Sequence, residues 1–65
     1  MKIDNKKLTL LMANAELSAL ELAKISNVNE VTICRIRKGS QVARPKTLGK
    51  LAKALNCKVE DFAEF

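Results

Sequence analysis

The residues of this chain that can do chemistry are mainly basic, and most of them fall in one part of the sequence. Twelve Lys and Arg residues against seven Asp and Glu residues give the 65-residue chain a formal net charge of +5. A long stretch of one sign is typical of a surface that faces phosphate groups, although many basic runs are simply solvated. No acid occurs between Glu30 and Glu60, and the basic residues there are Arg35, Arg37, Lys38, Arg44, Lys46, Lys50, Lys53 and Lys58.

Other kinds of chemistry have little support in the sequence. The chain has no histidine, no close carboxylate pair beside a plausible base and no glycine-rich loop, so we expect no enzyme activity and no cofactor. Cys34 and Cys57 are isolated, and we expect reduced thiols that serve as small apolar residues and hold no metal. No stretch reaches the roughly 18 apolar residues of a membrane span, and the N-terminus lacks a signal-like run, which predicts a cytoplasmic protein.

The elements that must position the basic residues are predicted to be helices. Apolar residues recur at helical spacing throughout, and no alternating run of useful length favours a strand. With two Phe and no Trp or Tyr, the core must be aliphatic. We therefore expect one all-α domain over residues 1–65, with five helices at 5–13, 19–25, 30–38, 45–56 and 59–64.

Helix starts and ends are marked by particular residues. Ser18 and Glu21, three residues apart, predict a capping box at the start of the second helix. Asn29 and Gly39 suit the two ends of the third helix. Pro45 suits the first position of the fourth helix, inside which Gly49 favours a close approach of another helix. The last helix has the poor capping residue Lys58 before it, so we expect a frayed start.

Residues 18–38 combine the features of a helix-turn-helix. Such a motif needs a small residue in its first helix, a turn residue that tolerates positive φ, and an apolar residue that fills the angle between the helices. Ala23, Asn27 and Val28 meet these needs in order, and Ile33 and Ile36 can anchor the second helix inward. The pattern predicts a DNA-binding motif, although a helical hairpin in an unrelated bundle remains the alternative.

This segment and its surroundings resemble the phage repressor and Cro-like (XRE-type) helix-turn-helix family. The resemblance covers nearly the whole chain and implies a compact five-helix, lambda-repressor-like domain. It further implies that the 30–37 helix lies in the major groove of duplex DNA, often in a homodimer on a near-palindromic operator. The chain departs from the family pattern at Ala19, Ser26, Asn27 and Arg37. The matching segments are Leu17-Ser18, Glu21-Leu22-Ala23, Val28, Thr32-Ile33, Arg35-Ile36, Lys38-Gly39, Thr47-Leu48, Leu51-Ala52-Lys53-Ala54-Leu55 and Val59-Glu60-Asp61.

Helix geometry selects the residues that would contact DNA bases. At about 100° per residue, the direction opposite Ile33 and Ile36 is shared by Val31, Arg35 and Lys38, with Cys34 beside them. An arginine can bond guanine O6 and N7 together, a valine can contact a thymine methyl, and a glutamate can accept from cytosine. We therefore expect base contacts from Glu30, Val31, Cys34 and Arg35.

Each of these residues also has a plainer interpretation. Arg35 can be a phosphate contact or a free surface charge, and Cys34 can simply fill space. Glu30 can have a purely structural role, because an acidic side chain is favourable at the positive N-terminus of a helix. The residues beside the base-contacting set are suited to the DNA backbone, and we expect such contacts from Asn29, Thr32, Lys38, Arg44 and Lys46.

The sequence leaves two functions open. One is a sequence-specific transcriptional regulator of the repressor type, in a bacterial or mobile-element circuit. The other is an antitoxin or adaptor that uses the same scaffold chiefly to hold a partner protein, for which Leu10, Leu20 and Phe65 could serve. A co-purifying partner would distinguish the second from the first. For dimerisation on DNA, the candidate contacts are Phe65 and Leu10.

Overall fold

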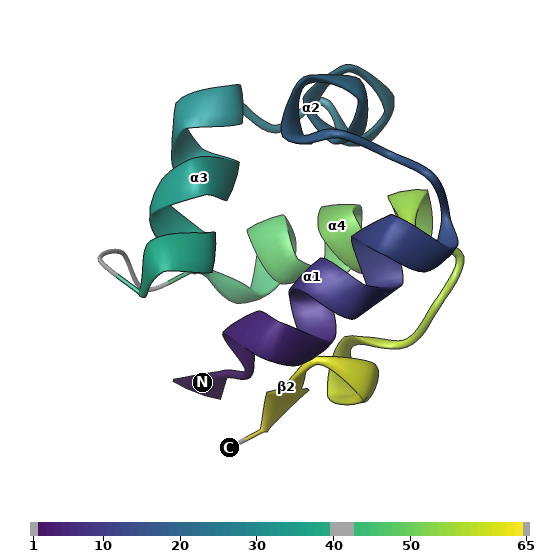
Figure 1. Cartoon of the computed structure of the whole chain (residues 1–65). Helices are drawn as coiled ribbons and strands as arrows, with labels where there is room; N and C mark the ends of the chain where they lie inside the picture. Colours follow the sequence, from purple (N-terminus) through teal and green to yellow (C-terminus); the bar gives the residue numbers. More distant parts are fainter. Residues whose placement is uncertain (1, 40–42, 65) are drawn as a thin grey trace.

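The computed structural model describes residues 2–39 and 43–64 of the chain (Figure 1). Within this part, four α-helices surround a small apolar core, with α2 above and α3 to one side of α1 and α4 in the view of Figure 1. The helices are α1 (Asn5–Asn14), α2 (Ala19–Ser26), α3 (Glu30–Lys38) and α4 (Pro45–Ala54). A short strand, β1 (Lys2–Ile3), precedes α1. A 3₁₀ helix, η1 (Val59–Asp61), and a second short strand, β2 (Ala63–Glu64), follow α4.

The helix starts follow the capping residues of the sequence. Asp4 accepts hydrogen bonds from two backbone amides of α1, and the capping box of Ser18 and Glu21 is present at α2. Asn29 caps α3 through Oδ1, which lies 2.8 Å from the amide nitrogen of Val31. These bonds satisfy amides that the first turn of a helix leaves without intrahelical partners. α4 begins at Pro45 without a side-chain cap.

Two helices end in left-handed residues that the sequence did not reveal. Glu16 after α1 and Asn56 after α4 have φ of 57° and 55°. The amide of Leu17 donates to the carbonyl oxygen of Met12 over 3.0 Å, and the amide of Cys57 makes the equivalent bond at α4. This is the hydrogen-bond pattern in which a left-handed residue reverses the chain at a helix C-terminus.

The predicted fifth helix over 59–64 is wrong, because only the single 3₁₀ turn Val59–Asp61 forms there. Its start is held by Asp61, whose Oδ2 accepts from the Lys58 amide over 3.0 Å, so the poor capping residue is compensated from within the turn. Phe62 follows, 1% exposed, and its burial turns the chain inward before another helical turn can form.

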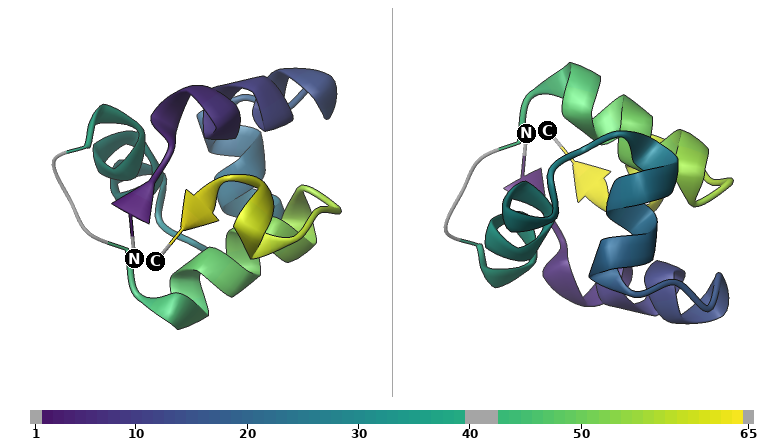
Figure 2. Two further views of the ribbon diagram at one scale, coloured as in Figure 1. Left: turned by 90° about the horizontal axis from the view of Figure 1, so that it is seen from below. Right: turned by 90° about the horizontal axis from the view of Figure 1, so that it is seen from above.

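β1 and β2 form an antiparallel pair that was not expected, in which Lys2 is opposite Glu64 and Ile3 is opposite Ala63. The amide of Asp4 continues the pairing with a 2.8 Å bond to the carbonyl oxygen of Phe62. The two ends of the described chain therefore lie side by side (Figures 1 and 2). Strands of two residues are too short to produce an alternating sequence pattern, so the sequence could not reveal them.

The core joins residues from all four α-helices. Leu8, Leu22 and Phe62, from widely separated parts of the chain, are almost fully buried. The expected aliphatic character is confirmed, since Phe62 is the one aromatic member of the core among the described residues. The buried apolar residues are Leu8, Met12, Leu22, Val28, Ile33, Ile36, Ala43, Leu48, Leu51, Ala52, Leu55, Phe62 and Ala63.

Gly49 does not mark a close helix approach, and that expectation was wrong. A Cβ atom built at Gly49 would have no neighbouring heavy atom within 4 Å among the described residues. Gly39, in contrast, ends α3 with φ +77°, and a Cβ there would lie 3.2 Å from Nδ2 of Asn5. Only the second glycine is therefore required by local geometry.

We expect Gly49→Ala to raise the free energy of unfolding by about 0.5–1 kcal/mol, because alanine restricts the unfolded chain and fits an exposed helix interior. Gly39→Ala is the matched control and should destabilise, since a side chain at this φ is strained. Urea unfolding followed by circular dichroism measures both changes. A loss of stability in Gly49→Ala would contradict the open surroundings of this position.

Candidate nucleic-acid interface

The turn between α2 and α3 depends on three residues. Asn27 ends α2 in the left-handed conformation, with φ 59° and ψ 34°. Val28, 8% exposed, then turns into the core, while Ala23 is half-buried and contacts the same core from α2. Asparagine tolerates this conformation better than most residues other than glycine, so it can replace glycine in the turn. The resulting sharp turn sets the angle at which α3 leaves α2.

Ser26, one of the positions at which the chain departs from the family that it resembles, is buried. Its side chain is 7% exposed, and its hydroxyl donates a 2.6 Å hydrogen bond to the carbonyl oxygen of Leu22 one turn earlier. A buried hydroxyl is costly only when it lacks a partner, so this bond makes the polar residue compatible with the core. The departure at Ser26 therefore leaves the motif geometry intact.

α3 has one buried side and one exposed side. Ile33 and Ile36 are 0% and 1% exposed, and they fix the inner side of the helix in the core. On the outer side, Val31 is 54% exposed, and Glu30 and Arg35 are exposed as well. The outer side of α3 therefore presents one apolar and two charged side chains to the solvent.

The other predicted contact residues differ in how exposed their side chains are. Cys34 and Thr32 are half-buried, so they offer less surface than Arg35. Lys38 is exposed at the end of α3, and Arg44 and Lys46 are exposed at the start of α4. In the sequence, Lys38 therefore precedes residues 40–42, and Arg44 and Lys46 follow them.

Asn29 is exposed, but the cap of α3 already uses part of its side chain. Because Oδ1 accepts from the Val31 amide, the amide NH₂ group is the part of the side chain that can donate to an external acceptor. The first turn of α3 also carries backbone amides with no acceptor one turn earlier in the helix. Both features favour an anion near the N-terminus of this helix.

Arg37 does not belong to the exposed basic set. Its side chain is half-buried, and Nε is shielded from water with no hydrogen-bond partner among the described residues. Charge alone does not distinguish this arginine from its exposed neighbours Arg35 and Lys38, but helical spacing does, because Arg37 follows the buried Ile33 by four residues and lies on the same side of α3. Sequence reasoning also missed Ile25, which is 60% exposed at the end of α2.

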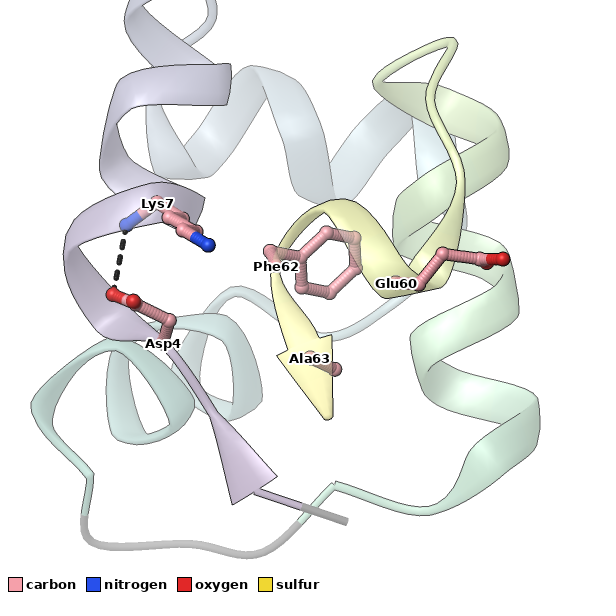
Figure 3. A pocket seen from close by; sticks show the side chains of 5 residues that line it. All are labelled: Asp4, Lys7, Glu60, Phe62 and Ala63. Atoms are coloured by element: carbon pink, nitrogen blue, oxygen red, sulfur yellow. Dashed lines mark hydrogen bonds between the residues drawn. The ribbon is translucent and has the colours of Figure 1, made fainter. Parts of the chain in front are cut away.

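A small pocket lies on another part of the molecule, between the start of α1 and the C-terminal segment (Figure 3). It is lined by Asp4, Lys7, Glu60, Phe62 and Ala63, and Oδ1 of Asp4 accepts a hydrogen bond from the backbone amide of Lys7. Asp4 thus serves as a helix cap and Phe62 as a core residue, so structural roles account for both. Among the described residues, no three Cys, Asp or Glu side chains are grouped as a metal site would require.

The family of the chain is shown by comparison with known families. The model of the Cro/C1-type HTH DNA-binding domain matches residues 7–65, which is most of the sequence. The chain therefore belongs to this family of DNA-binding domains, and the resemblance stated from the sequence is confirmed. No curated protein and no solved structure matches the chain. None of the helices in the described part is long and apolar enough to cross a membrane.

The capping box also gives the motif a pH dependence. The backbone amide of Ser18, its hydroxyl and the charge of Lys24 lower the pKa of Glu21 below its ordinary value. A carboxyl whose pKa is lowered by folding stabilises the native state above its unfolded pKa, and this contribution is lost as pH falls through the folded pKa.

We therefore expect Glu21→Gln to remove part of the acid sensitivity of the fold. The variant should be less stable than the wild type at neutral pH, and the difference in stability should narrow as the pH is lowered below the ordinary range of a glutamate carboxyl, because protonation of Glu21 then removes the charge that supports the cap. Urea unfolding of both proteins across this pH range measures the difference. A gap that stays constant over the whole range would show that the ionised Glu21 does not support the cap.

Proposed function

We propose that this chain is a sequence-specific transcriptional regulator of the repressor type, which inserts α3 into the major groove of duplex DNA. It would act in the cytoplasm as part of a small bacterial or mobile-element circuit. The observation that carries the proposal is the division of α3 between a buried side, anchored by Ile33 and Ile36, and an exposed side with Val31 and Arg35. Membership of a DNA-binding family supports the same conclusion.

Each exposed residue of α3 in the proposed base-contacting set has a matching group on the edge of a base pair. The guanidinium group of Arg35 would donate to O6 and N7 of guanine, which is the commonest specific contact in the major groove. Val31 would contact the methyl group of thymine, and Glu30 would accept from the amino group of cytosine. Cys34, half-buried beside them, would add van der Waals contact with the base edges.

Contacts with the sugar–phosphate backbone would hold α3 in register. The basic residues at the end of α3 and the start of α4 are exposed, so their side chains can reach phosphates on either side of the groove. The NH₂ group of Asn29 and the amides beside it would bind a further phosphate. The proposed backbone set is Asn29, Thr32, Lys38, Arg44 and Lys46.

A symmetric dimer on DNA completes the proposal. One module of this size offers too little surface for the affinities of specific regulators, and two copies would contact half-sites about one helical turn apart. Leu10, 62% exposed on α1, is a candidate for the contact between the copies. Phe65, the other candidate, lies outside the described residues.

Binding to duplex DNA should depend strongly on salt. Each phosphate contact contributes a slope of about −0.9 to the log–log plot of affinity against salt, so several contacts predict at least a tenfold loss between about 50 and 200 mM. Fluorescence anisotropy with a labelled duplex measures the slope. An affinity that barely changes over this range would refute the proposed electrostatic contacts.

Two alanine variants should separate base contacts from backbone contacts. Arg35→Ala should lose roughly 1–3 kcal/mol of discrimination between a selected site and a scrambled duplex, because a bidentate contact with guanine is specific. Lys46→Ala should weaken both duplexes alike and lower the salt slope by about one. Both side chains are exposed, so both variants should keep the helical circular dichroism of the wild type. An equal loss on both duplexes for Arg35→Ala would make Arg35 a backbone contact.

The dimer is tested by stoichiometry. Analytical ultracentrifugation with a duplex that holds two half-sites should give two chains per duplex, and Leu10→Ser should weaken the binding of the second chain. The exposed Leu10 side chain has little role in the core, so this variant should fold normally. A complex of one chain per duplex at saturation would contradict the dimer.

A further inference from the structure

A second feature of the surface lies between α2 and α4. A hollow there is lined by residues from the last turn of α2 and the second half of α4, which lie beside each other in Figures 1 and 2. None of its lining residues belongs to α3 or to the proposed DNA contacts. The lining residues are Ile25, Ser26, Lys50, Lys53 and Ala54.

Ile25 and Ala54 make part of the lining of the hollow apolar. Ile25 is 60% exposed although α2 buries Leu22 and Ser26 on its other side, so its side chain contributes little to the core. Ala54 adds a methyl group from α4. Ser26 offers no free donor, because its hydroxyl already donates to the Leu22 carbonyl oxygen. Burying an aliphatic side chain such as Ile25 is favourable, which makes this position suited to contact with another apolar group.

The rim of the hollow is positively charged. Lys50 is half-buried and Lys53 is exposed, and both line the hollow from one side of α4. A half-buried lysine lays its methylene groups along an apolar surface and keeps its ammonium group in water. Lys24, next to Ile25 in the sequence, is exposed as well. No acidic residue lines the hollow within the described part of the chain.

We propose that this hollow binds an acidic amphipathic segment of a partner protein, which places an apolar side chain against Ile25 and carboxylates beside the lysines. Helices with an apolar stripe commonly bind in such hollows, and charges at the rim select the partner and accelerate association. A DNA phosphate fits less well, because it would leave the apolar Ile25 without a counterpart. The chain would thus contact protein through α2 and α4 while α3 faces DNA.

The test uses a fluorescent amphipathic peptide with leucines on one helical face and glutamates on the other. Its anisotropy should rise with added protein. Ile25→Ser and Lys53→Glu should each weaken the affinity roughly tenfold, because they remove the apolar contact and reverse a rim charge. Lys46→Glu is the matched control, since it makes the same charge change at an exposed position of α4 outside the hollow. This control should lose DNA affinity and keep peptide affinity, and Lys53→Glu should do the reverse.

Four outcomes would overturn the proposal. Absence of peptide binding would remove the site, and equal binding of polyglutamate would reduce it to charge attraction. Equal effects of Lys46→Glu and Lys53→Glu on DNA binding would assign the hollow to the DNA-binding surface. Self-association of the wild type that Ile25→Ser abolishes would assign it to a second copy of the chain. Each of these results leaves the proposed role of α3 to be judged by its own DNA-binding measurements.

Discussion

The arrangement of the proposed DNA-binding surface depends on the burial of Ile33 and Ile36. These two side chains fix the rotation of α3 about its own axis, and this rotation decides which residues face outward. Together they contribute roughly 3–6 kcal/mol by the usual value for a buried aliphatic side chain, against a net stability of roughly 3–10 kcal/mol for a domain of 65 residues. The same contacts therefore stabilise the fold and orient Arg35, so the two properties cannot be changed independently through this pair.

The turn and the caps determine where α3 begins. Asn27 in the left-handed conformation and Val28 in the core set the path from α2, and Asn29 supplies the first cap of α3. The pairing of β1 with β2 closes the opposite side of the domain, where Phe62 packs beneath the chain ends. A chain of this length has a small core. Each turn, cap or strand pair therefore accounts for a larger share of the stability of the domain than it would in a larger domain.

The sequence predicts most of the helical frame because its signals are local. The capping box at Ser18, the turn at Asn27 and the two ends of α3 follow from interactions within a few residues. The features that it could not predict depend on tertiary packing: the inward burial of Phe62 shortens the last helix to a 3₁₀ turn, and the strand pair joins distant ends of the chain. The half-buried position of Arg37, in contrast, follows from helical spacing, because Arg37 lies four residues after the buried Ile33 and therefore on the same side of α3.

The central claim is that the outer side of α3 contacts DNA bases. The most direct test is to recover a duplex by selection from a random library and to map the amide chemical shifts of the isotope-labelled protein on binding it. The largest changes should fall on Glu30, Val31 and Arg35, with a second group in the first turn of α4. Failure of the library to yield an enriched sequence, or largest changes centred on α1 and the strand pair, would contradict the account.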